Sequence, residues 1–290
     1  MPKYIDIHAH VNFKVFYLDR DEVIKRALEN DTWLINVGTQ VDTSRNAIEL
    51  AHKYPEGVHA IVGLHPIHTE EALHDEDEVS GPGFKSRAEE FDKNIYREFL
   101  KDEKVVGIGE CGLDYYHLNP KLIEKQKKAF MEQIELASEM QKPLMLHIRN
   151  NPEDKTVNAY FDTWQLIKDF NEKNPKAKVK GVSHFFAGKV EDMQRFVELG
   201  IYVSFSGPIT YKIKLEICDY QTVIKETPLN MILTDTDSPY VAPVPYRGKR
   251  NEPVYVREIV KKIAEIKNLR EEEVAEAIVR NAKKLFDIQS

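Results

Sequence analysis

The sequence has few cysteines, no long apolar run and no excess of positive charge. Only two cysteines, Cys111 and Cys218, occur among 290 residues, which is typical of a reducing compartment and argues against a disulfide framework. No segment approaches the roughly 18 uninterrupted apolar residues that a membrane span needs. The chain enters an expected strand at Tyr4, which leaves no room for a signal peptide. We therefore expect a cytoplasmic protein with no membrane partner.

The formal net charge of −7 argues against a broad basic surface that would hold nucleic acid. It does not exclude a local anion site. The stretch Tyr246-Arg247-Gly248-Lys249-Arg250 is locally basic and is the candidate for such a site. A solvated loop is the alternative interpretation of the same residues.

Short apolar runs rich in β-formers alternate with helical patterns along the whole chain. The expected strands are residues 4–8, 33–37, 59–64, 105–110, 144–148, 181–185, 202–206 and 231–234. The expected helices are 19–29, 43–53, 88–101, 120–140, 160–171, 189–199, 253–266 and 270–286. Eight such units predict a (β/α)8 TIM barrel. No break in composition divides the chain, so we expect one domain over 1–290, with a long loop at 74–87 that could form a flap near the site.

Polar side chains of the kinds that bind metals follow six of the eight expected strands. They are His8 and His10, His65, Glu110, His147, His184 and Asp237. His8 and His10 are two residues apart and therefore project from one face of the first strand. Because a barrel brings the carboxyl ends of its strands to one face, we expect all of these side chains to converge there. His65 aside, four histidines and two carboxylates exceed the needs of one ion and fit two divalent ions that share a bridging carboxylate.

Each of these residues also has an ordinary structural explanation when it is taken alone. A histidine after a strand is more often a hydrogen-bonded rim residue than a ligand. Glu110 could pair with an arginine, and Asp237 could cap the turn at Ser238-Pro239. The metal interpretation rests on the whole set, since only a barrel would bring all of its members to one point.

The motifs resemble those of the TatD-like metal-dependent deoxyribonucleases, which belong to the amidohydrolase superfamily. The resemblance covers nearly the whole chain, and the motifs occur in the order typical of that family. The matching segments are Asp6-Ile7-His8-Ala9-His10, Gly109-Glu110-Cys111-Gly112-Leu113-Asp114-Tyr115, His147-Ile148-Arg149, Thr234-Asp235-Thr236-Asp237-Ser238-Pro239-Tyr240, Tyr246-Arg247-Gly248-Lys249-Arg250-Asn251-Glu252-Pro253 and residues 281–286.

The resemblance implies a division of the ligands between two divalent ions, which would be Mg, Mn or Zn. His8, His10 and Asp237 hold the first ion, His147 and His184 hold the second, and Glu110 bridges the two. Related amidohydrolases place a carbamylated lysine at the fourth strand, but no lysine lies between Val105 and His117. The fourth strand therefore favours the TatD-like arrangement over a phosphotriesterase-like one.

Three features depart from the family pattern. The residue two before the ligand aspartate is usually Glu, and here it is Asp235. Asn150-Asn151-Pro152 follows Arg149, where an acidic residue and small residues are expected. The segment 68–94 is longer than usual. These changes leave the metal set intact and bear on substrate preference and on the mouth of the site.

The resemblance implies DNA as the substrate, attacked from an end with a preference for single strands, and a narrow pocket at a barrel mouth would admit a frayed end more readily than a duplex. We expect a metal-activated water to cleave the phosphodiester. Asp237 is the expected proton acceptor, and Glu110 is the essential bridge. His65 could contact the phosphate or protonate the leaving oxygen; a structural histidine before Pro66 is the equal alternative. Asp114 could orient a ligand histidine or a substrate group.

Arg149 and Arg247 are candidates to bind phosphate, because a guanidinium can bind two phosphate oxygens at once. A salt bridge at the rim is the alternative for Arg149. Tyr115, Tyr116 and Tyr240 could stack on bases, although at least one is expected only to pack. An ester or amide hydrolase, such as a D-aminoacyl-tRNA deacylase, is the alternative activity. A metal-free binding scaffold is the third class, and the complete ligand set argues against it. The sequence indicates no obligate protein partner.

Overall fold

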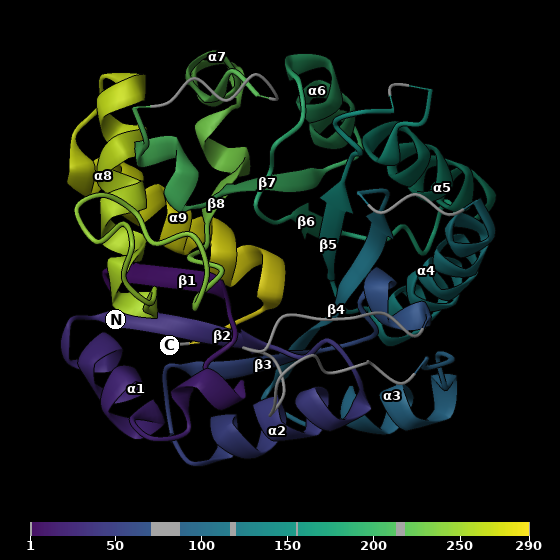
Figure 1. Ribbon diagram of the computed structural model, residues 1–290, viewed down its shortest axis with the longest axis horizontal. Helices are drawn as coiled ribbons and strands as arrows, with labels where there is room; N and C mark the ends of the chain where they lie inside the picture. Colours follow the sequence, from purple (N-terminus) through teal and green to yellow (C-terminus); the bar gives the residue numbers. More distant parts are fainter. Residues whose placement is uncertain (1, 71–87, 117–119, 155, 213–217, 290) are drawn as a thin grey trace.

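The computed structural model describes residues 2–70, 88–116, 120–154, 156–212 and 218–289. Eight parallel strands pair in the order β1-β2-β3-β4-β5-β6-β7-β8 and form a nearly closed barrel with helices around it (Figure 1). The strands are β1 (Tyr4–Ala9), β2 (Thr32–Val37), β3 (Val58–Val62), β4 (Val105–Asp114), β5 (Leu144–Arg149), β6 (Gly181–Ser183), β7 (Ile201–Phe205) and β8 (Ile232–Thr234). The predicted TIM barrel is confirmed.

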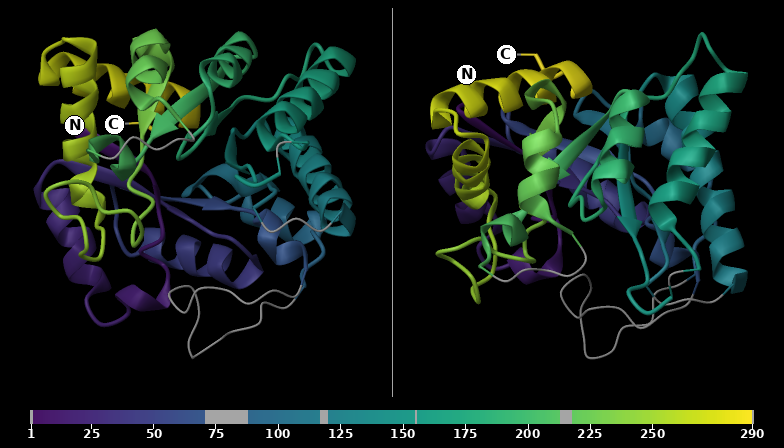
Figure 2. Two further views of the ribbon diagram at one scale, coloured as in Figure 1. Left: turned by 45° about the horizontal axis from the view of Figure 1, so that its top comes forward. Right: turned by 90° about the horizontal axis from the view of Figure 1, so that it is seen from above.

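The helices of the described residues lie outside the barrel, as two further views show (Figure 2). They are α1 (Arg20–Glu29), α2 (Val41–His52), α3 (Lys93–Phe99), α4 (Pro120–Met140), α5 (Ala159–Lys173), α6 (Val190–Glu198), α7 (Tyr220–Glu226), α8 (Val256–Lys267) and α9 (Glu271–Phe286). Short 3-10 helices are η1 (Lys14–Phe16), η2 (Pro66–Thr69), η3 (Gly207–Thr210), η4 (Leu229–Met231) and η5 (Pro253–Tyr255). No helix in the described part of the chain is long and apolar enough to cross a membrane.

The strands are buried on both faces, which is why their sequences are nearly continuous apolar runs. All six residues of β1 and all six of β2 are buried. Helix α9 shows how the outer layer is stabilised. Its first turn carries Glu271 and its last turn carries Lys283, which complements the helix dipole, while Val274 and Ile278 are buried against the barrel.

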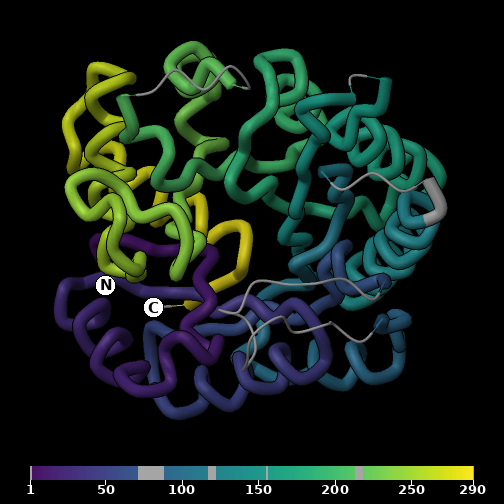
Figure 3. The backbone as a smooth tube through the Cα atoms, viewed as in Figure 1, coloured from purple at the N-terminus to yellow at the C-terminus, as the bar shows by residue number. Residues whose placement is uncertain are grey.

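The chain winds once around the barrel, so its first and last parts lie side by side (Figure 3). The Tyr4 hydroxyl donates a hydrogen bond to Glu271, 2.9 Å away on α9. Between β8 and β1 the ladder is reduced to an isolated bridge, Ala9 to Ser238. The Asp6 carboxylate reinforces this seam by accepting a hydrogen bond from the Thr236 backbone amide at 2.8 Å.

The observed elements differ from the expected ones at several ends. Strand β4 continues to Asp114, so Glu110 lies within the strand and not at its end. Strand β6 ends at Ser183, which leaves His184 beyond the ladder. Helix α3 begins at Lys93, because Asp92 caps it by accepting from the backbone amides of residues 94 and 95. The short helix α7 was not predicted, and the expected loop 74–87 lies outside the described residues.

Candidate metal centre

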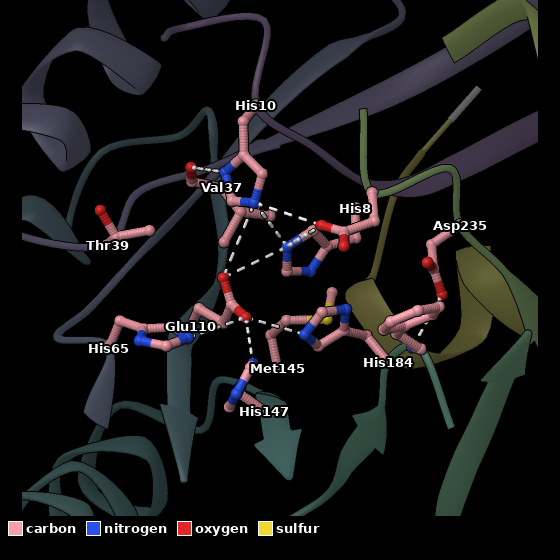
Figure 4. Close-up of polar contacts among 12 residues, drawn as sticks. His8, His10, Val37, Thr39, His65, Glu110, Met145, His147, His184 and Asp235 are labelled. Atoms are coloured by element: carbon pink, nitrogen blue, oxygen red, sulfur yellow. Dashed lines mark hydrogen bonds and ion pairs between the residues drawn. The ribbon is translucent and has the colours of Figure 1, made fainter. Parts of the chain in front are cut away.

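The predicted ligands converge on the carboxylate of Glu110 at the carboxyl ends of the strands (Figure 4). Its Oε1 atom lies 2.8 Å from His147 Nδ1 and 2.8 Å from His184 Nε2. Its Oε2 atom lies 3.4 Å from His8 Nε2 and 3.7 Å from His10 Nε2. The two oxygens of one carboxylate therefore face two separate pairs of histidines.

The seam between β8 and β1 positions the other carboxylate. Asp237 donates its backbone amide to the His8 carbonyl at 2.9 Å, and His10 donates its own to the Ser238 carbonyl at 2.8 Å. These bonds bring Asp237 Oδ1 to 3.5 Å from His10 Nε2 and 3.7 Å from His8 Nε2. Asp237 has a left-handed backbone with φ of 52°, a conformation that aspartate adopts more readily than most residues.

The donor atoms fit divalent cations in their chemistry and their spacing. Within the described residues, three sets of donor atoms could hold an ion: His8, His184 and Asp237; His8, His10 and Glu110; and His65, Glu110 and His147. A metal with ligands at about 2.0–2.2 Å places two of them roughly 3.0–3.5 Å apart. The His8 and His10 Nε2 atoms are 3.0 Å apart. His8 is within reach of both carboxylates, so the geometry does not assign it to one ion alone.

Hydrogen bonds at the far side of two rings fix which nitrogen faces the centre. His10 Nδ1 lies 3.0 Å from the Val37 carbonyl, which only accepts, so Nδ1 carries the proton and Nε2 keeps its lone pair. His147 Nε2 lies 2.9 Å from Asp114 Oδ2, and this leaves Nδ1 to face Glu110. In its neutral form each ring would present a lone pair to the centre, and each has the outer partner that metal-bound histidines usually have. Asp114, expected at a ligand histidine or at substrate, lies at the histidine.

His65 has the opposite arrangement. Its Nδ1 accepts a hydrogen bond from the Ile67 backbone amide at 3.2 Å, so in the neutral ring the proton sits on Nε2. Nε2 lies 3.4 Å from Glu110 Oε1 and therefore faces the centre as a donor. In this tautomer Nε2 has no lone pair for a metal, so an ion held by His65, Glu110 and His147 would need the other tautomer. His65 differs in this respect from His10 and His147, whose outer nitrogens face acceptors.

Burial and mutual charge shift the ionisation of the centre. Burial alone would raise the pKa of Glu110, but the surrounding histidines hold it well below its ordinary value. Burial and the neighbouring His184 lower the pKa of His8 to about 3. Burial also opposes charge on His147, yet its hydrogen bonds to Asp114 and Glu110 raise its pKa to about 10. The metal-free centre thus holds a proton that a metal would displace.

The two arginines expected to bind phosphate are exposed and lie over tyrosine rings. The Arg149 guanidinium lies 3.7 Å from the centre of the Tyr116 ring, and the Arg247 guanidinium lies 4.4 Å from that of Tyr211. No carboxylate of the described residues pairs with either guanidinium. The salt bridge considered for Arg149 is therefore not seen there.

The remaining residues expected at the rim have structural contacts. Arg250, in the same basic stretch as Arg247, donates to Asp19 at 2.9 Å and to the Val15 carbonyl at 3.0 Å. Tyr115 is 1% exposed and donates to Asp162, so it packs and cannot stack on a base. Tyr240 lies edge-on to His10, with ring centres 6.5 Å apart.

The sequence interpretation missed several residues that shape the centre. Phe13 stacks on the His10 ring with centres 4.3 Å apart, and Asp6 joins β1 to β8. Asp235 accepts hydrogen bonds from two serine hydroxyls of the neighbouring β7 region. The alternation of Asp6 with His8 within β1 was a signal that Asp6 shares a face with the candidate ligands.

Comparison with known proteins agrees with this geometry. The sequence profile of the TatD-related DNase family matches residues 5–287. This chain belongs to that family. It is 35% identical over 285 residues to the uncharacterized metal-dependent hydrolase YabD of Bacillus subtilis, with 98% of each chain covered. It is 29% identical over 290 residues to the uncharacterized metal-dependent hydrolase YcfH of Escherichia coli, covering 99% of this chain and 96% of that protein.

Solved structures show the same fold. YJJV, a TatD homologue from Escherichia coli, superimposes with a TM-score of 0.79 at 25% identity over 99% of both chains. A TatD-family hydrolase from Entamoeba histolytica gives 0.75 at 22% identity over 98% of both chains. The TatD-family chain described here is thus a metal-dependent hydrolase built on a TIM barrel.

Proposed function

We propose that this metal-dependent hydrolase cleaves phosphodiester bonds of DNA from an exposed end, with two divalent ions at the centre. One observation carries the proposal: the two oxygens of Glu110 face two separate histidine pairs, 2.8 Å from His147 and His184 and 3.4–3.7 Å from His8 and His10. A carboxylate placed in this way is suited to bridge two ions. Two bound ions would lower the pKa of water and neutralise negative charge on a phosphoryl group.

Asp237 is the candidate proton acceptor. Its carboxylate lies beside His8 and His10, and its donor atom forms one candidate ion site with those of His8 and His184. Burial alone would raise its pKa, but its interactions with His10 and the other nearby histidines keep that pKa below its ordinary value. Asp237 is therefore ionised at neutral pH and able to accept the proton of an attacking water.

His65 is the candidate donor to a phosphoryl oxygen. Its Nε2 proton faces the centre, and burial lowers the pKa of the ring, which favours the neutral form. A neutral imidazole donates a hydrogen bond but gives up its proton poorly. Of the two roles considered from the sequence, contact with the phosphate is therefore favoured over protonation of the leaving oxygen.

Arg149 and Arg247 are the candidate contacts to the rest of a DNA strand. Each guanidinium is stacked on a tyrosine ring, which covers one of its faces and leaves its N–H groups directed outwards in the plane. Two such cations, one at the end of β5 and one on the loop after β8, suit a flexible single strand or a frayed end. The net charge of −7 fits weak, non-processive binding of DNA.

The test is a nuclease assay on single-stranded DNA labelled at the 3′ or the 5′ end. Metal-stripped protein should be inactive, and added Mg²⁺ or Mn²⁺ should restore shortening from one end. Glu110→Ala should abolish it. Protein that carries two metals but leaves DNA intact would rule out the nuclease assignment, and aminoacyl esters and amides would then be the substrates to test.

A further inference from the structure

A buried carboxylate next to the centre joins three consecutive strand ends without facing Glu110. Asp235 follows β8, is fully buried, and accepts hydrogen bonds from the hydroxyls of Ser204 and Ser206. It also accepts one from the backbone amide of Phe185 at 3.2 Å. The side chain lies beyond His184 on the side away from Glu110 (Figure 4). One carboxylate thus joins the ends of β6, β7 and β8.

The backbone around His184 needs such a support. Strand β6 is three residues long and ends at Ser183, so His184 lies outside the regular ladder. The next residue, Phe185, has a left-handed backbone with φ of 43° although it is not glycine. Such a conformation persists only when its surroundings hold it. On the β5 side His184 is held by one backbone bond, from its amide to the Leu146 carbonyl at 3.1 Å.

His184 also lacks the usual outer partner of a metal-bound histidine. Its Nε2 lies 2.8 Å from Glu110, but its buried Nδ1 has no hydrogen-bond partner among the described residues. His10 and His147 are each fixed by a bond to their outer nitrogen. The direction of the His184 ring therefore depends on its stacking against the His8 ring, with centres 3.8 Å apart, and on its backbone, which Asp235 holds through the amide of Phe185.

We propose that Asp235 is a positioning residue for the second metal. Asp235 fixes the turn after β6 and thereby holds the His184 imidazole against Glu110. The inference rests on the proposed two-metal function. The hydroxyls of Ser204, in β7, and Ser206, just beyond it, join the Phe185 amide in fixing the Asp235 carboxylate.

The experiment measures binding of Co²⁺ to metal-stripped protein by calorimetry and by the visible absorption of the bound ion. The variant is Asp235→Asn, whose amide would place an N–H group against one of the present donors. We expect one of two equivalents to bind about 10- to 100-fold more weakly, with a changed cobalt spectrum. His147→Ala should weaken the same equivalent and so identify it.

The matched control is Asp192→Asn on α6. Asp192 is also buried and accepts a backbone amide hydrogen bond, from Lys189 at 3.1 Å, but it lies in the outer layer of helices. Asp192→Asn should leave the affinities of both Co²⁺ equivalents unchanged. Normal binding of both equivalents by Asp235→Asn, or equal losses in both variants, would overturn the role of Asp235.

A milder variant keeps the test decisive if Asp235→Asn does not fold. Ser206→Ala removes one hydroxyl and leaves the carboxylate and its bond to Phe185, and it should weaken the same equivalent several-fold; no change would contradict the proposal. Binding of a single Co²⁺ by the wild-type chain is a separate result, because it would overturn the two-metal function itself.

Discussion

The proton on His65 gives the sharpest prediction about the reaction. Because the Ile67 amide occupies Nδ1 at 3.2 Å, the ring faces the centre with an N–H group. His65→Ala removes that donor, and His65→Gln offers an amide N–H in its place. A hydrogen bond to a charged group contributes about 1.5–3 kcal/mol, so loss of the donor should lower kcat roughly 10- to 150-fold. The glutamine variant should recover part of that loss.

The assay is hydrolysis of a chromogenic phosphodiester by protein loaded with Mn²⁺, followed from pH 6 to pH 9. A neutral donor predicts a similar loss at every pH. A general acid would instead give the wild-type enzyme an alkaline limb that disappears in His65→Gln. The control is His59→Gln, a largely buried histidine at the amino end of β3, far from the centre, which should leave kcat unchanged.

The metal content of the variants tests whether the His65 proton lies on Nε2. If His65 is a donor and not a ligand, both variants should bind as many ions as the wild-type chain, with affinities within a few-fold. Loss of an equivalent in His65→Gln would show that Nε2 carries a lone pair, and the assignment from the Ile67 contact would be wrong. Unchanged kcat in His65→Ala would remove the residue from the reaction.

Three further predictions concern the rest of the site. Glu110→Ala should lower metal-dependent hydrolysis by at least about 10³-fold while circular dichroism stays native; near-normal activity would reject the bridging role. Arg247→Ala should raise the KM for single-stranded DNA more than the KM for a small phosphodiester, and equal effects on both substrates would refute a role in binding the polymer. The control Arg250→Ala should mainly lower the thermal midpoint of unfolding, because Arg250 pairs with Asp19. Metal uptake at pH 8 should release a proton, since the pKa of His147 is raised to about 10. Calorimetry in two buffers of different ionisation enthalpy should measure this proton release, and Asp114→Asn should diminish the release.

The same pKa predicts how the stability of the metal-free protein depends on pH. The ring of an unfolded histidine titrates near 6.5, and that of folded His147 near 10. The added stability is therefore fully present below about pH 6.5 and is lost as the pH rises towards 10. The unfolding free energy of metal-stripped protein should fall across that range, and a flat profile in urea titrations would contradict the shift.

The barrel and the convergence of the candidate ligands were predictable because both depend on simple periodicity. Apolar runs fixed the order of eight strands, and the side chains that follow them converge for a topological reason. Strand ends were less predictable. β4 extends to Asp114, and β6 stops at Ser183, because hydrogen bonding to neighbouring strands decides where a ladder ends.

The roles of the individual histidines depend on backbone groups that no motif records. His10 and His65 are both histidines that follow barrel strands, and the sequence gives no reason to treat their ring nitrogens differently. The Val37 carbonyl faces one Nδ1, and the Ile67 amide faces the other. The carbonyl oxygen favours a ligand role for the His10 ring, and the amide proton favours a donor role for the His65 ring. Chemistry at this centre is thus assigned by main-chain atoms that lie behind the histidines, and sequence motifs alone cannot separate the two roles.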